Sequence, residues 1–256
     1  MASPMFEHEI TRAAVLFQKA RYAVALTGAG ISTPSGIPDF RNRDTGLWEH
    51  VDPVEVASIY GFRRNPQAFF DWIRPLAGLL RSAEPNPAHH ALAQMEAKGH
   101  LKALITQNID MLHTRAGSRM VYEVHGHLRT ATCIACSANY PTESFIESFI
   151  EGGAIPRCAA CGGILKPDVI LYGEQLSAAV LHAAVRAARE CDLMLVAGSS
   201  LTVAPASELP MLAAMNGAGI IIVNDDTTYI DSRASVAIHA DVAEILPRIA
   251  AELEVK

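Results

Sequence analysis

The sequence lacks any long apolar run, and this absence excludes several classes of protein. No apolar stretch approaches the roughly 20 residues that a transmembrane helix requires. The N-terminus carries acidic residues with a helix-like apolar spacing, where a signal peptide would carry basic residues followed by an apolar core. We therefore expect a cytoplasmic protein that does not associate with a membrane.

Clustered basic residues are also missing. Lys and Arg number 21 against 27 Asp and Glu, for a net charge of −6, and the basic residues are spread along the chain. Proteins that bind nucleic acid directly concentrate Lys and Arg on one face, so direct nucleic-acid binding is not expected. The chain also has no internal repeat and no low-complexity tract, and we favour a compact monomer.

What the sequence does contain is an alternation of short apolar runs with helical patterns, which is typical of a parallel sheet covered by helices on both faces. Strands are expected at 22–27, 101–106, 121–124, 193–197, 220–224 and 236–238. Helices are expected at 9–20, 65–81, 87–98, 178–190, 205–216 and 242–253. The predicted fold class is therefore α/β, with a doubly wound, Rossmann-like parallel sheet.

Two stretches interrupt this alternation. Residues 43–85 are aromatic and helical, and residues 127–166 hold four of the five cysteines. We expect both to be insertions that form a small second domain, made of a helical module with a cofactor loop and a zinc ribbon. The Rossmann-like domain then comprises residues 1–42, 86–126 and 167–256.

The four cysteines form two C-x-x-C pairs, Cys133 with Cys136 and Cys158 with Cys161. Two such pairs complete the tetrahedral thiolate shell of a structural zinc ion. A redox dithiol needs only one pair, the spacing does not specifically indicate an iron–sulfur cluster, and four thiolates leave no open position for catalytic zinc. The fifth cysteine, Cys191, is expected to be a buried small apolar residue.

A glycine-rich turn follows the first predicted strand. Gly28 and Gly30 allow a sharp turn whose N–H groups approach a pyrophosphate at a strand-to-helix corner. The third glycine of the dinucleotide fingerprint is missing, because Ser32 and Thr33 occupy its place. The specificity must therefore come from the following segment 37–41, which reads IPDFR.

Polar residues follow two further predicted strands. The segment 107–110 reads QNID, and His125 follows the strand at 121–124. Carboxyl ends of parallel strands lie at one edge of an open α/β sheet, where ligands bind. We therefore expect one crevice to gather Asp39, Arg41, Asn108, Asp110 and His125.

Together these motifs resemble those of the sirtuins, the NAD-dependent protein lysine deacylases. The resemblance rests on GAGIS, IPDFR, TQNID, HG, the paired C-x-x-C motifs, GSS at 198–200 and VN at 223–224, which follow the family's order from about residue 23 to residue 242. It implies that NAD loses nicotinamide and that the acetyl group of an acetyl-lysine protein or peptide moves to ADP-ribose, giving O-acetyl-ADP-ribose. NAD and one structural zinc ion are the implied cofactors.

The resemblance also implies roles for the catalytic residues. His125 would be the general base for a ribose hydroxyl, since imidazole titrates near neutrality. Asn108 would orient the ribose or an ordered water, and Asp110 with the backbone of Ile109 would hold the nicotinamide carboxamide. Arg41 meets a phosphate or holds the loop 36–46 in its closed form, and Asp39 bonds either the loop backbone or the substrate.

The remaining implied contacts form two sets. NAD would be bound by Gly28, Ala29, Gly30, Thr33, Asp39, Phe40, Arg41, Gln107, Asn108, Ile109, Asp110, His125, Gly198, Ser199, Ser200, Asn224, Asp225 and Val242. The substrate peptide would lie as an extended strand against Val169, Leu171, Tyr172, Gly173, Glu174, Leu201 and Val203. An acid at Asp225 disfavours a 2′-phosphate, so NAD is preferred over NADP.

Two expectations concern the reaction itself. Sirtuins that remove succinyl or malonyl groups carry a Tyr and an Arg three residues apart in the aromatic helix, whereas FFDWIRP at 69–75 has no tyrosine, with Trp72 and Arg74 two apart. Acetyl or apolar acyl groups are therefore expected. Mono-ADP-ribosyl transfer or NAD hydrolysis is the alternative activity. A dehydrogenase is disfavoured by the missing third glycine. A third alternative is a non-enzymatic module that senses NAD, whose cellular role would survive His125→Ala.

Overall fold

The computed structural model describes residues 5–39 and 52–254. None of the helices in this part of the chain combines the length and the hydropathy that crossing a lipid bilayer would need.

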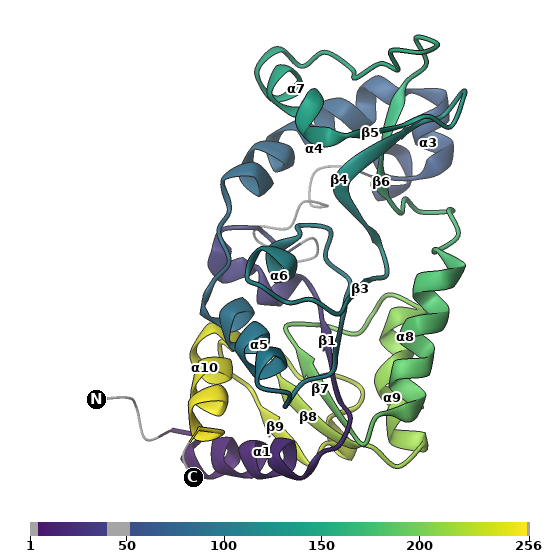
Figure 1. The fold of residues 1–256 in the computed structure, drawn as a ribbon. Coiled ribbons are helices and arrows are strands. Elements are labelled where there is room, and N and C mark those ends of the chain that lie inside the picture. The colour runs from purple at the N-terminus through teal and green to yellow at the C-terminus, as the bar shows by residue number, and fades with distance from the viewer. Residues whose placement is uncertain (1–4, 40–51, 255–256) are drawn as a thin grey trace.

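A six-stranded parallel sheet forms the larger layer of the molecule (Figure 1). Its strands are β1 (Ala23–Thr27), β2 (Ala103–Thr106), β3 (Val121–Glu123), β7 (Leu193–Ala197), β8 (Gly219–Val223) and β9 (Val236–Ile238). They lie in the order β3-β2-β1-β7-β8-β9. This is the doubly wound order, and the direction of winding reverses between β1 and β7, where such sheets bind ligands.

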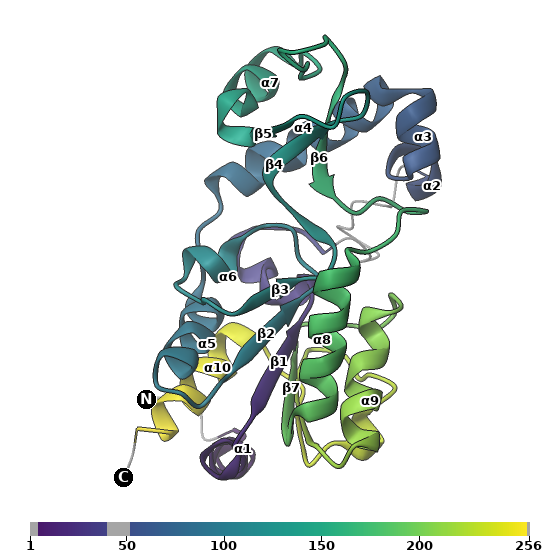
Figure 2. The same ribbon diagram turned by 45° about the vertical axis from the view of Figure 1, so that its right-hand side comes forward.

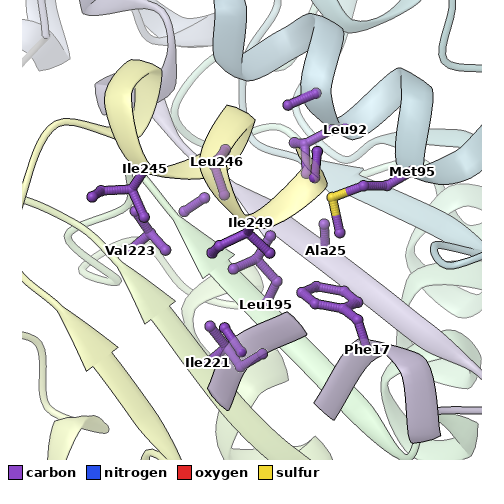
Figure 3. Packing of buried hydrophobic residues seen from close by; sticks show 14 of the residues in the cluster. Phe17, Ala25, Leu92, Met95, Leu195, Ile221, Val223, Ile245, Leu246 and Ile249 are labelled. Atoms are coloured by element: carbon purple, nitrogen blue, oxygen red, sulfur yellow. The ribbon is translucent and has the colours of Figure 1, made fainter. Parts of the chain in front are cut away.

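Helices cover both faces of this sheet. Alternate residues of β1 point to opposite faces, so Ala23 and Ala25 join one apolar cluster while Val24 and Leu26 join another. The first cluster packs under α1 (Glu7–Lys19), α5 (Pro87–Ala97) and α10 (Val242–Glu252), and the second under α8 (Ala178–Glu190) and α9 (Leu209–Met215). Figure 3 shows the first cluster, with Phe17 of α1 and Ile249 of α10 lying over the sheet residues Ala25 and Leu195.

The second layer lies at the end of the molecule opposite α1 (Figures 1 and 2). It contains an antiparallel sheet in the order β5-β4-β6. Its elements are β4 (Gly126–Cys133), β5 (Asn139–Pro141), β6 (Leu165–Val169), α7 (Ile146–Gly152), α2 (Pro53–Val56), α3 (Ile59–Arg64) and α4 (Pro66–Ser82). Phe70 of α4 meets Phe149 of α7 edge to face, with ring centroids 5.4 Å apart. The helical and cysteine-containing insertions therefore share one apolar core.

These layers confirm the predicted fold class, and every predicted strand is present within two residues. The helix expected at 205–216 is wrong in its first turn, which is the 3₁₀ helix η4 (Ala206–Glu208) followed by α9. Pro210 lies in the first turn of α9, where its missing N–H is tolerated because that turn has no intrahelical partner for it. Helices α6 (Leu112–Arg115) and α7 were not predicted. The domain boundaries remain predictions.

Candidate functional site

A cavity of about 360 Å³ opens at the carboxyl ends of β1 and β7, where the winding of the sheet reverses. It is lined by segments that lie far apart in the sequence. The predicted site residues in its lining are Gly28, Ala29, Gly30, Asp39, Gln107, Asn108, Ile109, His125, Val169, Leu171, Tyr172, Gly173, Glu174, Gly198, Ser199, Ser200 and Val203. Of the five residues expected in one crevice, Asp39, Asn108 and His125 line this cavity, Asp110 does not, and Arg41 lies outside the described residues.

The turns after β1 and β7 pack directly against each other. A Cβ atom on Gly28 would lie 2.9 Å from the carbonyl oxygen of Gly198, and one on Gly30 would lie 3.0 Å from the same oxygen. The N–H groups of Gly28 and Gly30 donate to the carbonyl oxygens of Ala197 and Gly198, at 3.3 and 2.9 Å. We expected these N–H groups to face a pyrophosphate, but the glycines instead let two turns meet and leave a side-chain-free floor to the cavity.

Amide side chains after β2 connect the two halves of the cavity. Gln107 Nε2 donates to Ser199 Oγ at 2.9 Å, across the reversal point. Asn108 Nδ2 donates to the carbonyl oxygen of Gly28 and to Ser32 Oγ, both at 3.0 Å. The amides and hydroxyls offered here suit the hydroxyl-rich sugars and phosphates of a dinucleotide.

Next to these amide side chains lies a buried row of polar side chains connected by hydrogen bonds. The Asp110 carboxylate accepts hydrogen bonds from the Ser32 hydroxyl at 2.7 Å and the Leu112 N–H at 2.9 Å, and burial raises its pKa. The Asn86 N–H donates to His89 Nδ1, so the hydrogen of the neutral ring is on Nε2, which faces Ser32 Oγ at 3.4 Å. Burial lowers the pKa of His89 to about 4 and keeps the ring neutral.

Sequence reasoning did not assign Ser32 or His89 to the site. Ser32 directly precedes Thr33, which stands where the third glycine would be, and this position beside the glycine-rich turn was the only signal it gave. His89 is the third residue of the Asn86 capping box at the start of α5, so its local pattern indicates a helix cap.

His125 lies between β3 and β4 and lines the cavity. Its Nδ1 is 3.0 Å from the carbonyl oxygen of Gln107, which can only accept, so Nδ1 carries the hydrogen and Nε2 is the basic nitrogen. Gly126 follows with a φ of +79°, and a Cβ there would lie 2.1 Å from the carbonyl oxygen of Asp168. The glycine lets β4 approach β6 closely and so fixes the direction of the histidine.

The far end of the cavity is apolar and was incompletely predicted. The sequence analysis did not assign to the cavity the lining residues Ala57, Phe69, Ile73, Leu176 and Ala204, and it considered Trp72 only for the acyl preference. The spacing of Phe69, Trp72 and Ile73 on one helical face was the available signal. Arg74 points elsewhere, because its guanidinium donates to the carbonyl oxygens of Ile150 and Glu151 at 2.8 and 2.6 Å. No Lys or Arg is among the described residues that line the cavity.

The predicted peptide-binding segment continues beyond the end of β6 and is attached to the helical insertion by an isolated β-bridge. Tyr172 pairs in parallel with residues 57–59, through Tyr172 N–H to Ala57 O at 2.9 Å and Ile59 N–H to Tyr172 O at 3.0 Å. The chain then turns, with Glu174 N–H donating to Leu171 O at 3.0 Å and Gly173 at a φ of +84°. Such a turn favours glycine at its third position.

Six of the predicted residues do not line the cavity. Asp110 and Leu201 are buried behind it, and Thr33 bonds the carbonyl oxygen of Gly30. Asn224 and Asp225 follow β8, and Val242 is buried at the start of α10. Burial and the neighbouring Asp241 and Asp226 raise the pKa of Asp225. Phe40 and Arg41 lie outside the described residues.

The four paired cysteines converge as predicted. All four Sγ atoms lie within 4.8 Å of one another, with Cys133 to Cys161 at 3.5 Å and Cys136 to Cys158 at 3.6 Å. A tetrahedral zinc ion with Zn–S bonds of about 2.3 Å places its sulfurs about 3.8 Å apart. The side chains therefore fit zinc, and four thiolates make it a closed, structural site. Cys191 is buried elsewhere, as expected.

Comparisons with known proteins agree with this geometry. A model of the Sir2 family matches residues 28–205. The NAD-dependent protein deacylase 2 of Archaeoglobus fulgidus is 49% identical over 249 residues, which is 97% of each chain. The NAD-dependent protein deacetylase of Sulfolobus acidocaldarius is 44% identical over 246 residues, 96% of each chain.

Solved structures extend the comparison. A structure described as a basis for the mechanism and regulation of Sir2 enzymes matches with a TM-score of 0.90 at 48% identity, covering 97% of this chain and 98% of that one. A Sir2 variant with a deacetylated p53 peptide and 3′-O-acetyl-ADP-ribose matches with a TM-score of 0.89 at 37% identity, covering 95% of this chain and 98% of that one. Sir2Af2 with a myristoylated histone peptide matches with a TM-score of 0.83 at 43% identity, covering 97% of each chain. The chain belongs to the Sir2 family.

Proposed function

We propose which residues of the cavity bind NAD, which bind the acyl-lysine peptide and which catalyse NAD-dependent protein deacetylation. The chain is an NAD-dependent protein deacetylase, as its full-length relatives are, and its substrates are acylated peptide segments of proteins. One observation supports the assignment of roles: the turn after β1, the segment 107–109 and His125 meet around one cavity that continues into an apolar end.

The polar end of the cavity is proposed to bind NAD. NAD supplies the glycosidic bond that is broken, releasing nicotinamide and exposing a ribose carbon to the acetyl oxygen. Ile109 and Asp110 are proposed to hold the carboxamide, and the hydrogen bonds from Ser32 and Leu112 fix the Asp110 carboxyl for that task. Ser199, Ser200 and Gln107 are proposed to bind ribose hydroxyls, as are Asn224 and Asp225 beyond β8, with Val242 packing on the adenine.

His125 is proposed to be the general base. The carbonyl oxygen of Gln107 holds the hydrogen on Nδ1, so Nε2 accepts the proton of a ribose hydroxyl. Asn108 is held by Gly28 and Ser32, and we propose that it orients the ribose. Both side chains are positioned by the backbone of neighbouring turns, and such preorganisation is what a base needs to act on a single hydroxyl.

The apolar end is proposed to receive the acyl group. Phe69, Trp72 and Ile73 bring only apolar surface and one indole to the cavity, and Arg74 is engaged with α7. The described residues that line the cavity offer no cation to a succinyl or malonyl carboxylate, and desolvating an unpaired carboxylate is costly. The relative that was solved with a myristoylated peptide supports the acceptance of apolar acyl groups. We therefore propose acetyl and apolar acyl-lysines as substrates, held between residues 169–174 and 198–203.

The test is incubation with NAD and an acetyl-lysine peptide, with nicotinamide release and product masses followed together. Formation of O-acetyl-ADP-ribose is expected, and His125→Ala should lower turnover by about 10²–10⁴-fold, the usual contribution of a general base. The matched control is His182→Ala, because His182 is exposed on α8. ADP-ribosylated peptide in place of O-acetyl-ADP-ribose would support the transferase and contradict the proposal.

A further inference from the structure

Lys166 of β6 has a half-buried ammonium group in an unusual position. Its side chain is 13% exposed, and the residue does not line the cavity. The ammonium donates to the carbonyl oxygens of Pro167 at 3.0 Å and Val169 at 2.8 Å, and it lies 3.0 Å from Glu174 Oε2. An ammonium has three N–H donors, so these three acceptors use all of them.

Glu174 completes the same arrangement from the other end of the loop. Its Oε2 also accepts the Leu171 N–H at 2.8 Å, while its own N–H donates to Leu171 O. The Glu174 side chain is 21% exposed and borders the cavity. The carboxylate therefore closes the turn 171–174, and Lys166 balances its charge.

The two residues thus grip the segment 169–174 at both ends. Lys166 holds the entry through the carbonyl oxygen of Val169, and through Glu174 it holds the exit. The lysine lies on an edge strand, since the small sheet has the order β5-β4-β6 (Figure 2). The carbonyl groups of an edge strand need partners other than a further strand, and here the ammonium supplies two of those bonds.

We propose that Lys166 is a positioning residue for peptide binding: its ammonium sets the shape of the segment 169–174, against which the acyl-lysine peptide docks. This inference rests on the proposed placement of the peptide along that segment. The NAD end is connected by other bonds, such as Gln107 to Ser199 and Asn108 to Gly28, so Lys166 acts on the peptide and not on the dinucleotide.

The test compares Lys166→Met with the wild-type enzyme in steady-state kinetics. The KM for an acetyl-lysine peptide should rise by about tenfold or more, the size expected when a charge-assisted hydrogen bond is lost. The KM for NAD and the zinc content should stay at wild-type values. Lys166→Arg keeps the charge and the donors and should recover most of the peptide affinity.

The matched control is Lys98→Met. Lys98 also pairs with a glutamate, Glu254, but far from the cavity and 44% exposed, and its loss should leave the peptide KM unchanged. If Lys166→Met does not fold, Glu174→Gln answers the same question, because it removes the charge of the acceptor and leaves the bonds of Lys166 to β6 in place. The Glu174→Gln peptide KM should then rise.

Two results would overturn the proposal. One is a wild-type peptide KM in folded Lys166→Met, or in Glu174→Gln if the lysine variant does not fold. The other is an equal rise in the KM for NAD and the KM for peptide, which would show a general structural role. Product formation by the wild-type protein separates these outcomes from failure of the proposed function. If the proposed function were wrong, the wild-type protein itself would not form O-acetyl-ADP-ribose from NAD and the peptide.

Discussion

Position 126 has no room for a side chain. Gly126 has a φ of +79°, and a Cβ would lie 2.1 Å from the carbonyl oxygen of Asp168. Gly126→Ala should lower the free energy of unfolding by about 2 kcal/mol or more, because a left-handed conformation alone costs an alanine about 1–2 kcal/mol. Turnover should also fall, even where the variant is still folded, since His125 is the adjacent residue. Urea unfolding and turnover measurements check both effects.

A glycine elsewhere provides the control for this variant. A Cβ on Gly78, inside α4, would meet no atom within 4 Å. Gly78→Ala should therefore stabilise the protein by up to about 1 kcal/mol, the difference in helix propensity between the two residues. If both alanines had the same effect on unfolding, the steric argument at position 126 would be wrong.

Tyr140 makes a contact with the zinc site that the sequence did not indicate. Its hydroxyl is 3.2 Å from Cys158 Sγ, and a zinc-bound thiolate can only accept, so the phenol donates. Such outer contacts typically change metal affinity by about 10–100-fold. Tyr140→Phe should therefore release zinc faster to a colorimetric chelator while the wild-type fold is kept. An unchanged release rate would show that the contact does not stabilise the bound metal.

At the scale of elements, β4 and β6 connect the zinc site with the cavity. β4 begins directly after His125 and ends at the ligand Cys133, while β6 pairs Leu165 with Cys133 and Val169 with Gly126. The two strands therefore run from the four thiolates to the proposed base and to the peptide-binding segment. Zinc would hold the two strands together at the cysteine end, and their pairing shifts register once, between Ala131 and Gly126.

Removal of zinc should therefore disorder this small sheet first. A chelator or Cys133→Ser should abolish deacetylation and should remove hydrogen-exchange protection from residues 126–133 and 165–169. Protection of β1 and β7 should persist longer, because both strands are buried in the two large apolar clusters and not in the cysteine cluster. Full activity after verified zinc loss would contradict the claim that the zinc site supports the cavity through β4 and β6.

The elements also show what the sequence could and could not predict. The parallel strands were predicted because each is a short apolar run between helical patterns, and Ala178–Glu190 was predicted to the residue. The cysteine spacing predicted the metal site for the same local reason. Phe69 and Ile73 were not assigned to the cavity, because an apolar helical face looks the same whether it packs against a core or an acyl group. The link from His89 through Ser32 to Asp110 joins three distant segments, which no local pattern reveals.

At the scale of the whole molecule, two buried histidines connect the ligand site with overall stability. His89 of α5 and His113 of α6 have ring centroids 4.8 Å apart, and His113 Nε2 lies 2.9 Å from Thr27 Oγ1 at the end of β1. The rings thus join two helices to the central strand. Burial lowers the pKa of both, that of His89 to about 4, with a smaller effect of His90 on His89 and of His89 on His113.

The sign of the pH dependence follows from these directions. Below the ordinary histidine pKa of about 6.5 the unfolded chain takes up protons that the folded protein does not, until the pH nears 4. The stabilisation by neutral His89 is therefore complete above pH 6.5 and is lost as the pH falls. At pH 5 the loss from His89 alone should be about 2 kcal/mol, since each pH unit corresponds to about 1.4 kcal/mol. Asp110, whose pKa is raised, acts in the opposite direction.

His89→Gln should remove the His89 part of this acid sensitivity. The variant is expected to be less stable than the wild-type protein at pH 7, yet its free energy of unfolding should fall less steeply between pH 6.5 and 5, by about 1.4 kcal/mol per pH unit at the steepest point. Urea unfolding at several pH values measures both slopes. His182→Gln, at an exposed position on α8, should keep the wild-type slope. A wild-type slope in His89→Gln would mean that the neutral ring at position 89 does not make the fold acid-sensitive, and that other buried groups do.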